Sequence, residues 1–154
     1  MDITLLVVGK TTEKYLKEGM DIYLRRLDKY VKFKIIEIQP LKNTSGLSIE
    51  QIKEKESAII EKKLTSNNVV LLDERGKQMT SEEFADFLQN YMNRGAKCLT
   101  FVIGGSYGFS DKLRKKYPLM ALSKMTFAHQ MVRLFFVEQL YRAFTILKSE
   151  PYHH

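Results

Sequence analysis

Two adjacent glycines after an apolar run are the residues that most clearly suggest chemistry. The run Leu99–Ile103 leads directly into Gly104-Gly105-Ser106-Tyr107-Gly108. Glycines at the end of a strand let a ligand approach the backbone closely, but they also suit a tight turn that needs a positive φ. The G-x-G-x-x-G spacing is missing, so a dinucleotide-binding fingerprint is not supported. This motif alone leaves the ligand site and the plain turn equally open.

Two other groups of residues suggest a phosphate-binding loop and a metal site, but their spacing in the sequence argues against both kinds of site. Gly9-Lys10-Thr11 resembles the end of a phosphate-binding P-loop, but Thr4 stands where that motif needs its first glycine. We therefore exclude an NTPase and expect Lys10 on the surface. The histidines lack the spacing to cysteine or acidic residues that a zinc site requires, so we expect no metal. These histidines are His129, His153 and His154.

The balance of charges favours a polyanionic partner such as nucleic acid. The chain carries 25 Lys and Arg against 18 Asp and Glu, a net charge of +7. Basic residues also cluster directly after the glycine-rich segment, where the alternative is a solvated helix face. The cluster consists of Lys112, Arg114, Lys115 and Lys116.

The single cysteine and the first residues bear on the compartment. Cys98 has no partner in the chain, which fits a reducing cytosol and a small buried residue. Residues 3–8 are apolar but too few to span a bilayer, and Asp2 stands where a signal peptide has its basic region. We expect a soluble, cytoplasmic protein whose 154 residues, without repeat or linker, form one domain over 1–154.

Apolar runs and amphipathic segments alternate along the chain. Strands are predicted over Ile3–Val8, Phe33–Ile38, Asn68–Asp73, Leu99–Ile103 and Leu119–Leu122. Helices are predicted over about 13–30, 48–64 and 128–147, with one after the Thr80/Glu83 capping box and a short basic one after Gly108. The segment Glu74–Lys77 is predicted as the turn that ends the third strand.

Such alternation indicates an α/β fold with a parallel sheet covered by helices on both faces. Ligands bind beyond the carboxyl ends of the strands in these sheets. Here those ends lie at Gly9, Leu72-Asp73, Gly104-Gly105 and Ser123-Lys124, which is where we expect a site.

The last predicted helix is apolar on more than one face. A helix of this kind is buried on all sides or shared with a partner subunit, and the short chain favours a homodimer. Glu138 and Arg142 are spaced i,i+4 on its narrow polar stripe. A structural ion pair and a catalytic role are both open for them.

Read in order, several segments resemble one enzyme family along essentially the whole chain. The chain is similar to the small bacterial SPOUT-class enzymes that methylate N3 of a pseudouridine in 23S ribosomal RNA. The segments are Val102–Gly108, Leu122–Arg133, Glu138–Ala143 and Pro151–His153, with Leu6–Lys10 and Leu71–Lys77.

The resemblance implies a single-domain α/β SPOUT fold with a C-terminal trefoil knot, working as a homodimer. It implies S-adenosylmethionine as methyl donor and 23S ribosomal RNA, within the large subunit or the ribosome, as substrate. A non-catalytic RNA-binding protein on the same scaffold is the alternative. The donor pocket would be formed by Leu72, Gly104, Leu122, Ser123, Lys124, Met125, Thr126 and Phe127.

Methylation of an imide nitrogen requires that the nitrogen lose its proton, so a base is expected near the RNA-facing side. The resemblance fixes no single base, and the candidates are His129, Glu138, Tyr152 and His153. Arg133 and Arg142 are candidates for holding phosphate or the developing anion. This chain departs from the family at one position. Family members commonly carry a basic residue directly after the Pro-Tyr-His tail, whereas this chain has His154 there.

Overall fold

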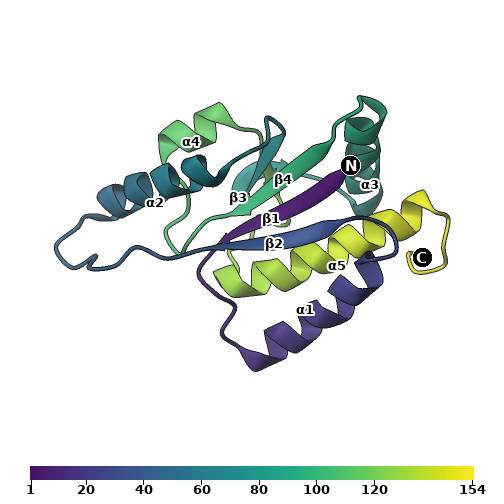
Figure 1. Ribbon diagram of the computed structural model, residues 1–154, viewed down its shortest axis with the longest axis horizontal. Helices are drawn as coiled ribbons and strands as arrows, with labels where there is room; N and C mark the ends of the chain where they lie inside the picture. The colour runs from purple at the N-terminus through teal and green to yellow at the C-terminus, as the bar shows by residue number, and fades with distance from the viewer.

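A five-stranded sheet, parallel throughout, forms the centre of the protein (Figure 1). The structure is a computed structural model that describes residues 1–154. The sheet has the order β2-β1-β4-β3-β5, so β2 is an edge strand. The strands are β1 (Asp2–Val8), β2 (Phe33–Ile38), β3 (Val69–Gln78), β4 (Cys98–Ile103) and β5 (Leu119–Ala121).

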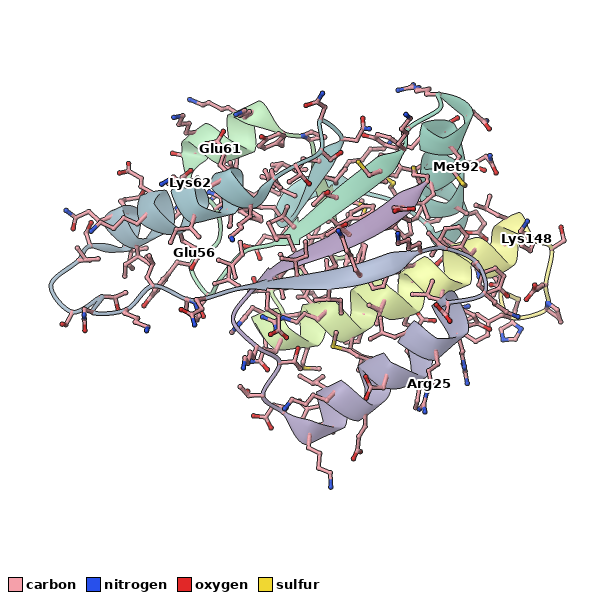
Figure 2. All side chains as sticks on the ribbon, viewed as in Figure 1. Arg25, Glu56, Glu61, Lys62, Met92 and Lys148 are labelled. Carbon is pink, nitrogen blue, oxygen red and sulfur yellow. The ribbon has the colours of Figure 1, made fainter.

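Helices cover both faces of the sheet, which confirms the predicted α/β class with a parallel sheet. The helices are α1 (Lys14–Leu27), α2 (Ile49–Lys63), α3 (Ser81–Asn93), α4 (Asp111–Lys116) and α5 (His129–Leu147). A core of 20 buried residues joins the sheet to α1, α3 and α5, and a second core of 9 joins its other face to α2 and α4. Charged residues such as Arg25 and Lys62 are exposed on their helices, and Lys148 is exposed just after α5 (Figure 2).

Local signals account for where two helices begin. The hydroxyl of Thr80 accepts the Glu83 N–H at 3.1 Å, and the Glu83 carboxylate accepts the Thr80 N–H at 2.8 Å. This confirms the predicted capping box, and Ser48 and Gln51 form a second one at the start of α2. The observed helices therefore lie within a few residues of the predicted ranges.

The turn predicted at Glu74–Lys77 is wrong, because β3 continues to Gln78. A bulge follows Leu72, and the strand then pairs again with β5, with Lys77 opposite Met120. Gly76 makes this close approach possible, since a Cβ there would lie 2.5 Å from the Met120 backbone nitrogen. Charged residues and glycine are uncommon in strands, so the sequence pattern did not indicate the extension.

The last helix lies against the sheet between α1 and α3 (Figure 1). Its buried side includes Phe136, Val137 and Leu140, so the chain itself covers much of its apolar surface. Phe135 is 38% exposed on the opposite side. None of the helices combines the length and the apolar character needed to cross a membrane.

Candidate active site

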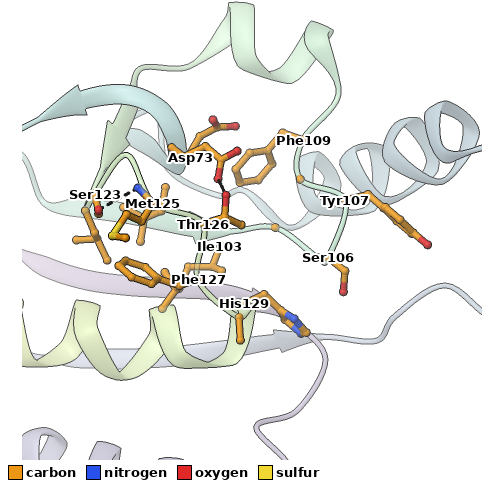
Figure 3. A pocket seen from close by; sticks show the side chains of 18 of the residues that line it. Asp73, Ile103, Ser106, Tyr107, Phe109, Ser123, Met125, Thr126, Phe127 and His129 are labelled. Carbon is orange, nitrogen blue, oxygen red and sulfur yellow. Dashed lines mark hydrogen bonds between the residues drawn. The ribbon is translucent and has the colours of Figure 1, made fainter.

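A cavity of about 360 Å³ opens beside residues 72–74 of β3 and at the carboxyl ends of β4 and β5 (Figure 3). In the close view Ser106, Tyr107 and Phe109 lie on the right, Met125 and Phe127 lie on the left, and His129 lies below them. The cavity stands at the edge of the sheet where the strand pattern placed a site. Its lining consists of 72–74, 103–109 and 122–129 without Lys124, together with Arg114, Met120 and Val132.

Seven of the eight residues predicted for the donor pocket line this cavity. Lys124 is the exception, because it is exposed and is not part of the lining. Leu72 is buried in the wall, whereas Met125 is 73% exposed at the mouth. The fold therefore brings together segments that are about 50 residues apart in the chain, and the role of these residues as donor ligands stays a prediction.

The glycine-rich segment forms a tight turn against the cavity. Gly108 has a φ of +77° and donates its N–H to the Gly105 carbonyl at 3.0 Å. At Gly104, an added Cβ would lie 3.2 Å from the Phe109 ring. At Gly105, it would lie 2.6 Å from the Glu56 carboxylate. The motif therefore forms a turn with a positive φ at Gly108, and its residues also line the cavity.

Glu56 was not singled out from the sequence, because it is one of several acidic residues in an ordinary amphipathic helix. Its Oε1 accepts the Gly105 N–H at 2.8 Å. Burial raises the pKa of the Glu56 carboxyl, and the hydrogen bond from Gly105 acts in the opposite direction. Only the three-dimensional contact shows that this side chain holds the glycine turn that lines the site.

The basic cluster after the turn does not act as one surface. Arg114 donates its Nε to Asp73 at 2.7 Å, and the two side chains are only 13% and 4% exposed. Asp73 also accepts the Arg75 N–H at 2.9 Å. Lys112 and Lys115 are exposed, as a solvated helix face requires. Arg114 thus joins α4 to the end of the buried part of β3.

Hydrogen bonds hold the segment after β5 in place. The Ser123 hydroxyl accepts the Met125 N–H at 3.0 Å, and the Thr126 hydroxyl donates to the Glu74 carboxylate at 2.8 Å. The Phe127 ring packs on Phe135 with centroids 5.1 Å apart. This segment therefore has a defined shape opposite the glycine turn.

His129 stands at the start of α5 and lines the cavity. Burial lowers its pKa, and the positive charge of Arg133 lowers it further. Both effects favour the neutral imidazole, which can accept a proton. Of the four candidate bases, only His129 lines this cavity.

Arg133 does not fit the predicted contact with RNA, because its side chain is completely buried. Its guanidinium donates to the Val8 carbonyl at 2.7 Å and to the Thr11 hydroxyl at 3.0 Å, while its Nε has no partner. The helical spacing pointed to a polar residue, but it did not show that the segment after β1 covers it. Arg133 fastens that segment to α5.

The remaining candidates form a separate cluster near the C-terminus. Glu138 accepts hydrogen bonds from Arg142 at 2.8 Å and from the Tyr152 hydroxyl at 3.1 Å. His153 lies 3.4 Å from Arg142 and 2.7 Å from Glu82. Burial raises the pKa of Tyr152, as do the hydroxyl of Tyr23 and the charge of Glu138.

This cluster lies away from His129 within one chain. Glu138 follows His129 by nine residues, which corresponds to about 13 Å along a helix. Glu138 instead lines a second cavity of about 230 Å³, which shares Met120, Leu122 and Phe127 with the first. No group of three His, Cys, Asp or Glu side chains is placed to hold a metal ion.

Comparison with known proteins places the chain in a family. The model described as "Predicted SPOUT methyltransferase" matches residues 1–153. A protein of Flavobacterium psychrophilum named "Ribosomal RNA large subunit methyltransferase H" is 54% identical, over 100% of this chain and 99% of its own length. Proteins of the same name from Bacteroides thetaiotaomicron and Geotalea daltonii are 51% and 47% identical, and each match also covers 100% of this chain and at least 99% of the relative.

Among solved structures, TrmJ from Z. mobilis aligns with a TM-score of 0.48 at 9% identity, over 93% of this chain and 70% of that chain. The full-length sequence matches agree with the resemblance carried by the glycine turn and the 122–133 segment. The chain belongs to the SPOUT methyltransferases, in the family of ribosomal RNA large subunit methyltransferase H.

Proposed function

We propose that this protein transfers a methyl group from S-adenosylmethionine to N3 of a pseudouridine in 23S ribosomal RNA. The substrate in this proposal is the large subunit or the ribosome, in the cytoplasm. The observation that carries the proposal is the cavity between the glycine turn and the 122–127 segment, in a chain similar to its family over its whole length. The name shared by its relatives supports ribosomal RNA as the class of substrate.

The cavity suits a methyl donor of this size and chemistry. Its volume of about 360 Å³ falls within the range of about 300–1,000 Å³ found for small-molecule sites. Leu72, Leu122 and Phe127 offer apolar walls for the adenine and the methionine chain. Gly104 lines the opposite side. S-adenosylmethionine supplies an electrophilic methyl group on a sulfonium centre when bound.

The residues of the chain contribute position and a proton acceptor. Fixing the turn and the 122–127 segment orients the two reactants for in-line transfer, from which much of the rate derives. We assign to His129 the role of accepting the proton of the imide nitrogen, because His129 lines the cavity and its lowered pKa keeps the imidazole neutral. Glu138 accepts hydrogen bonds from Arg142 and Tyr152, and His153 contacts Arg142, which gives these residues the role of fixing the tail against α5.

We further propose that the single domain is knotted and works as a homodimer. In support of the knot, β5 passes so close to Gly76 that its backbone excludes a side chain there. In support of the dimer, Phe135 is exposed beside an apolar cavity lined by Met79, Phe84 and Phe127.

Two measurements test the proposed activity. Titration calorimetry should give one site for S-adenosylmethionine per chain, whereas a non-catalytic RNA-binding protein would give no heat. Mass spectrometry of 23S ribosomal RNA should show one methylated pseudouridine that disappears when the gene is deleted and returns when it is restored. Unchanged RNA in the deletion strain would contradict the proposed reaction.

A further inference from the structure

Two neighbouring residues of α2 hold the glycine turn from outside the cavity. Glu56 accepts the Gly105 N–H at 2.8 Å, at the start of the turn. The hydroxyl of Ser57, a buried residue, accepts the Ser110 N–H at 3.0 Å, at the end of the turn. The wall of the cavity is therefore held at both ends by one helix that does not itself line the cavity. Figure 2 labels Glu56 on this helix.

The contact with Glu56 also explains why residue 105 is a glycine. The φ of Gly105 is not among the positive values of the chain, so backbone strain does not require a glycine there. Instead, a Cβ would lie 2.6 and 2.7 Å from the two carboxylate oxygens of Glu56. The absent side chain makes room for the carboxylate, and the carboxylate occupies the Gly105 N–H. That N–H is then not available to a ligand in the cavity.

We propose that Glu56 is a positioning residue for methyl-donor binding, which acts by holding the Gly105 amide and with it the shape of the turn. Glu56 touches no reactant. In this arrangement the donor would meet the backbone of the turn at Gly104, because the Gly105 N–H is already held by Glu56. The inference rests on the proposed function, since it concerns the same cavity.

Three variants test this role through the affinity for S-adenosylmethionine, measured by titration calorimetry. Glu56→Ala removes the acceptor and should raise the Kd by about tenfold or more, as expected for a lost hydrogen bond to a charged group. Glu56→Gln keeps a carbonyl oxygen in place of Oε1 and should stay within about threefold of the unaltered protein. Glu54→Ala is the matched control, because Glu54 is exposed on the same helix. An unchanged Kd in Glu56→Ala would overturn the proposal.

A double-variant cycle tests the coupling between the two residues. Gly105→Ala should weaken donor binding, because its Cβ displaces the Glu56 carboxylate. In the Glu56→Ala background, Gly105→Ala should raise the Kd for S-adenosylmethionine by less than about twofold more, because the carboxylate that the new Cβ would displace is gone. If the Kd of the double variant rises by the product of the two single effects, Gly105 is needed for another reason. That result would overturn the proposed coupling.

Hydrogen exchange of the Gly105 amide separates this inference from the proposed function. Without donor, exchange at Gly105 should be slow in the unaltered protein and in Glu56→Gln, and at least about tenfold faster in Glu56→Ala. If the unaltered protein binds no S-adenosylmethionine, the proposed function fails while the exchange result still decides whether Glu56 holds the turn. Equal exchange in all three proteins, each with an unchanged melting temperature, would overturn the role of Glu56.

Discussion

His129 and Arg133 stand one helical turn apart at the start of α5, yet burial gives them different roles. The guanidinium of Arg133 lies entirely inside and binds the Val8 carbonyl, whereas the ring of His129 reaches the cavity. The fixed charge of Arg133 disfavours a second positive charge nearby and so helps to lower the pKa of His129. A buried arginine can therefore support chemistry at the site without touching a reactant.

Replacing His129 tests its proposed role as proton acceptor. His129→Gln should lower the single-turnover rate by about 10²–10⁴-fold, the usual contribution of a general base. Donor affinity should stay within about threefold, because the cavity walls remain. In the unaltered protein the rate should fall as pH drops through the folded pKa of His129, since the protonated ring cannot accept a proton. The midpoint of that fall should lie below the ordinary histidine value of about 6.5, because burial lowers the pKa of His129. A full rate in His129→Gln would contradict the assignment.

Gly104 offers a test of where the donor approaches the backbone. Gly104→Val should abolish detectable binding of S-adenosylmethionine, because the branched side chain fills the approach. The change should also lower stability by about 1–3 kcal/mol, since a Cβ at this position stands 3.2 Å from the buried Phe109 ring. Calorimetry gives the affinity and a thermal melt verifies the fold. Binding retained by a folded Gly104→Val protein would refute this placement.

At the scale of elements, the sequence predicted most of the fold and part of the site. Apolar runs located the strands, and their carboxyl ends located the cavity, because parallel sheets have one edge where ligands bind. The contact between Glu56 and Gly105 could not be predicted, since it joins residues 49 positions apart. The burial of Arg133 and the separation of Glu138 from the cavity could not be predicted either, because both depend on how loops and helices pack in three dimensions.

The extension of β3 gives a prediction about stability. In Gly76→Ala the new Cβ would meet the backbone of β5, with Met120 N at 2.5 Å, and a backbone cannot move aside as a flexible side chain can. The two strands must separate locally, so we expect a loss of about 3 kcal/mol or more in the free energy of unfolding. Denaturant unfolding measures this loss. Gly46→Ala is a useful comparison, because no atom lies within 4 Å of its added Cβ, although its φ of +84° costs some strain. A loss in Gly76→Ala no larger than in Gly46→Ala would contradict the close approach of β3 and β5.

At the scale of the whole molecule, the two cavities meet at Phe127, and Phe135 stands exposed next to it. Phe127 lines both cavities, and its ring packs on Phe135. A second chain seated on this face of α5 would cover Phe135 and would therefore also affect the donor pocket. Oligomeric state and donor affinity should then change together.

Phe135→Asp tests this link. A carboxylate in an apolar interface is costly to desolvate, so the proposed homodimer should dissociate: the variant should sediment as a monomer and the unaltered protein as a dimer. The Kd for S-adenosylmethionine should rise in the same variant, because the Phe127 ring loses its packing partner and the covering chain. Ile22→Asp is the matched control, since Ile22 is 43% exposed on α1 and should tolerate the charge without dissociation. Analytical ultracentrifugation and calorimetry on the same samples give both quantities. A Phe135→Asp protein that remains dimeric would place the interface elsewhere, because a buried, unpaired carboxylate cannot persist at the centre of a stable contact.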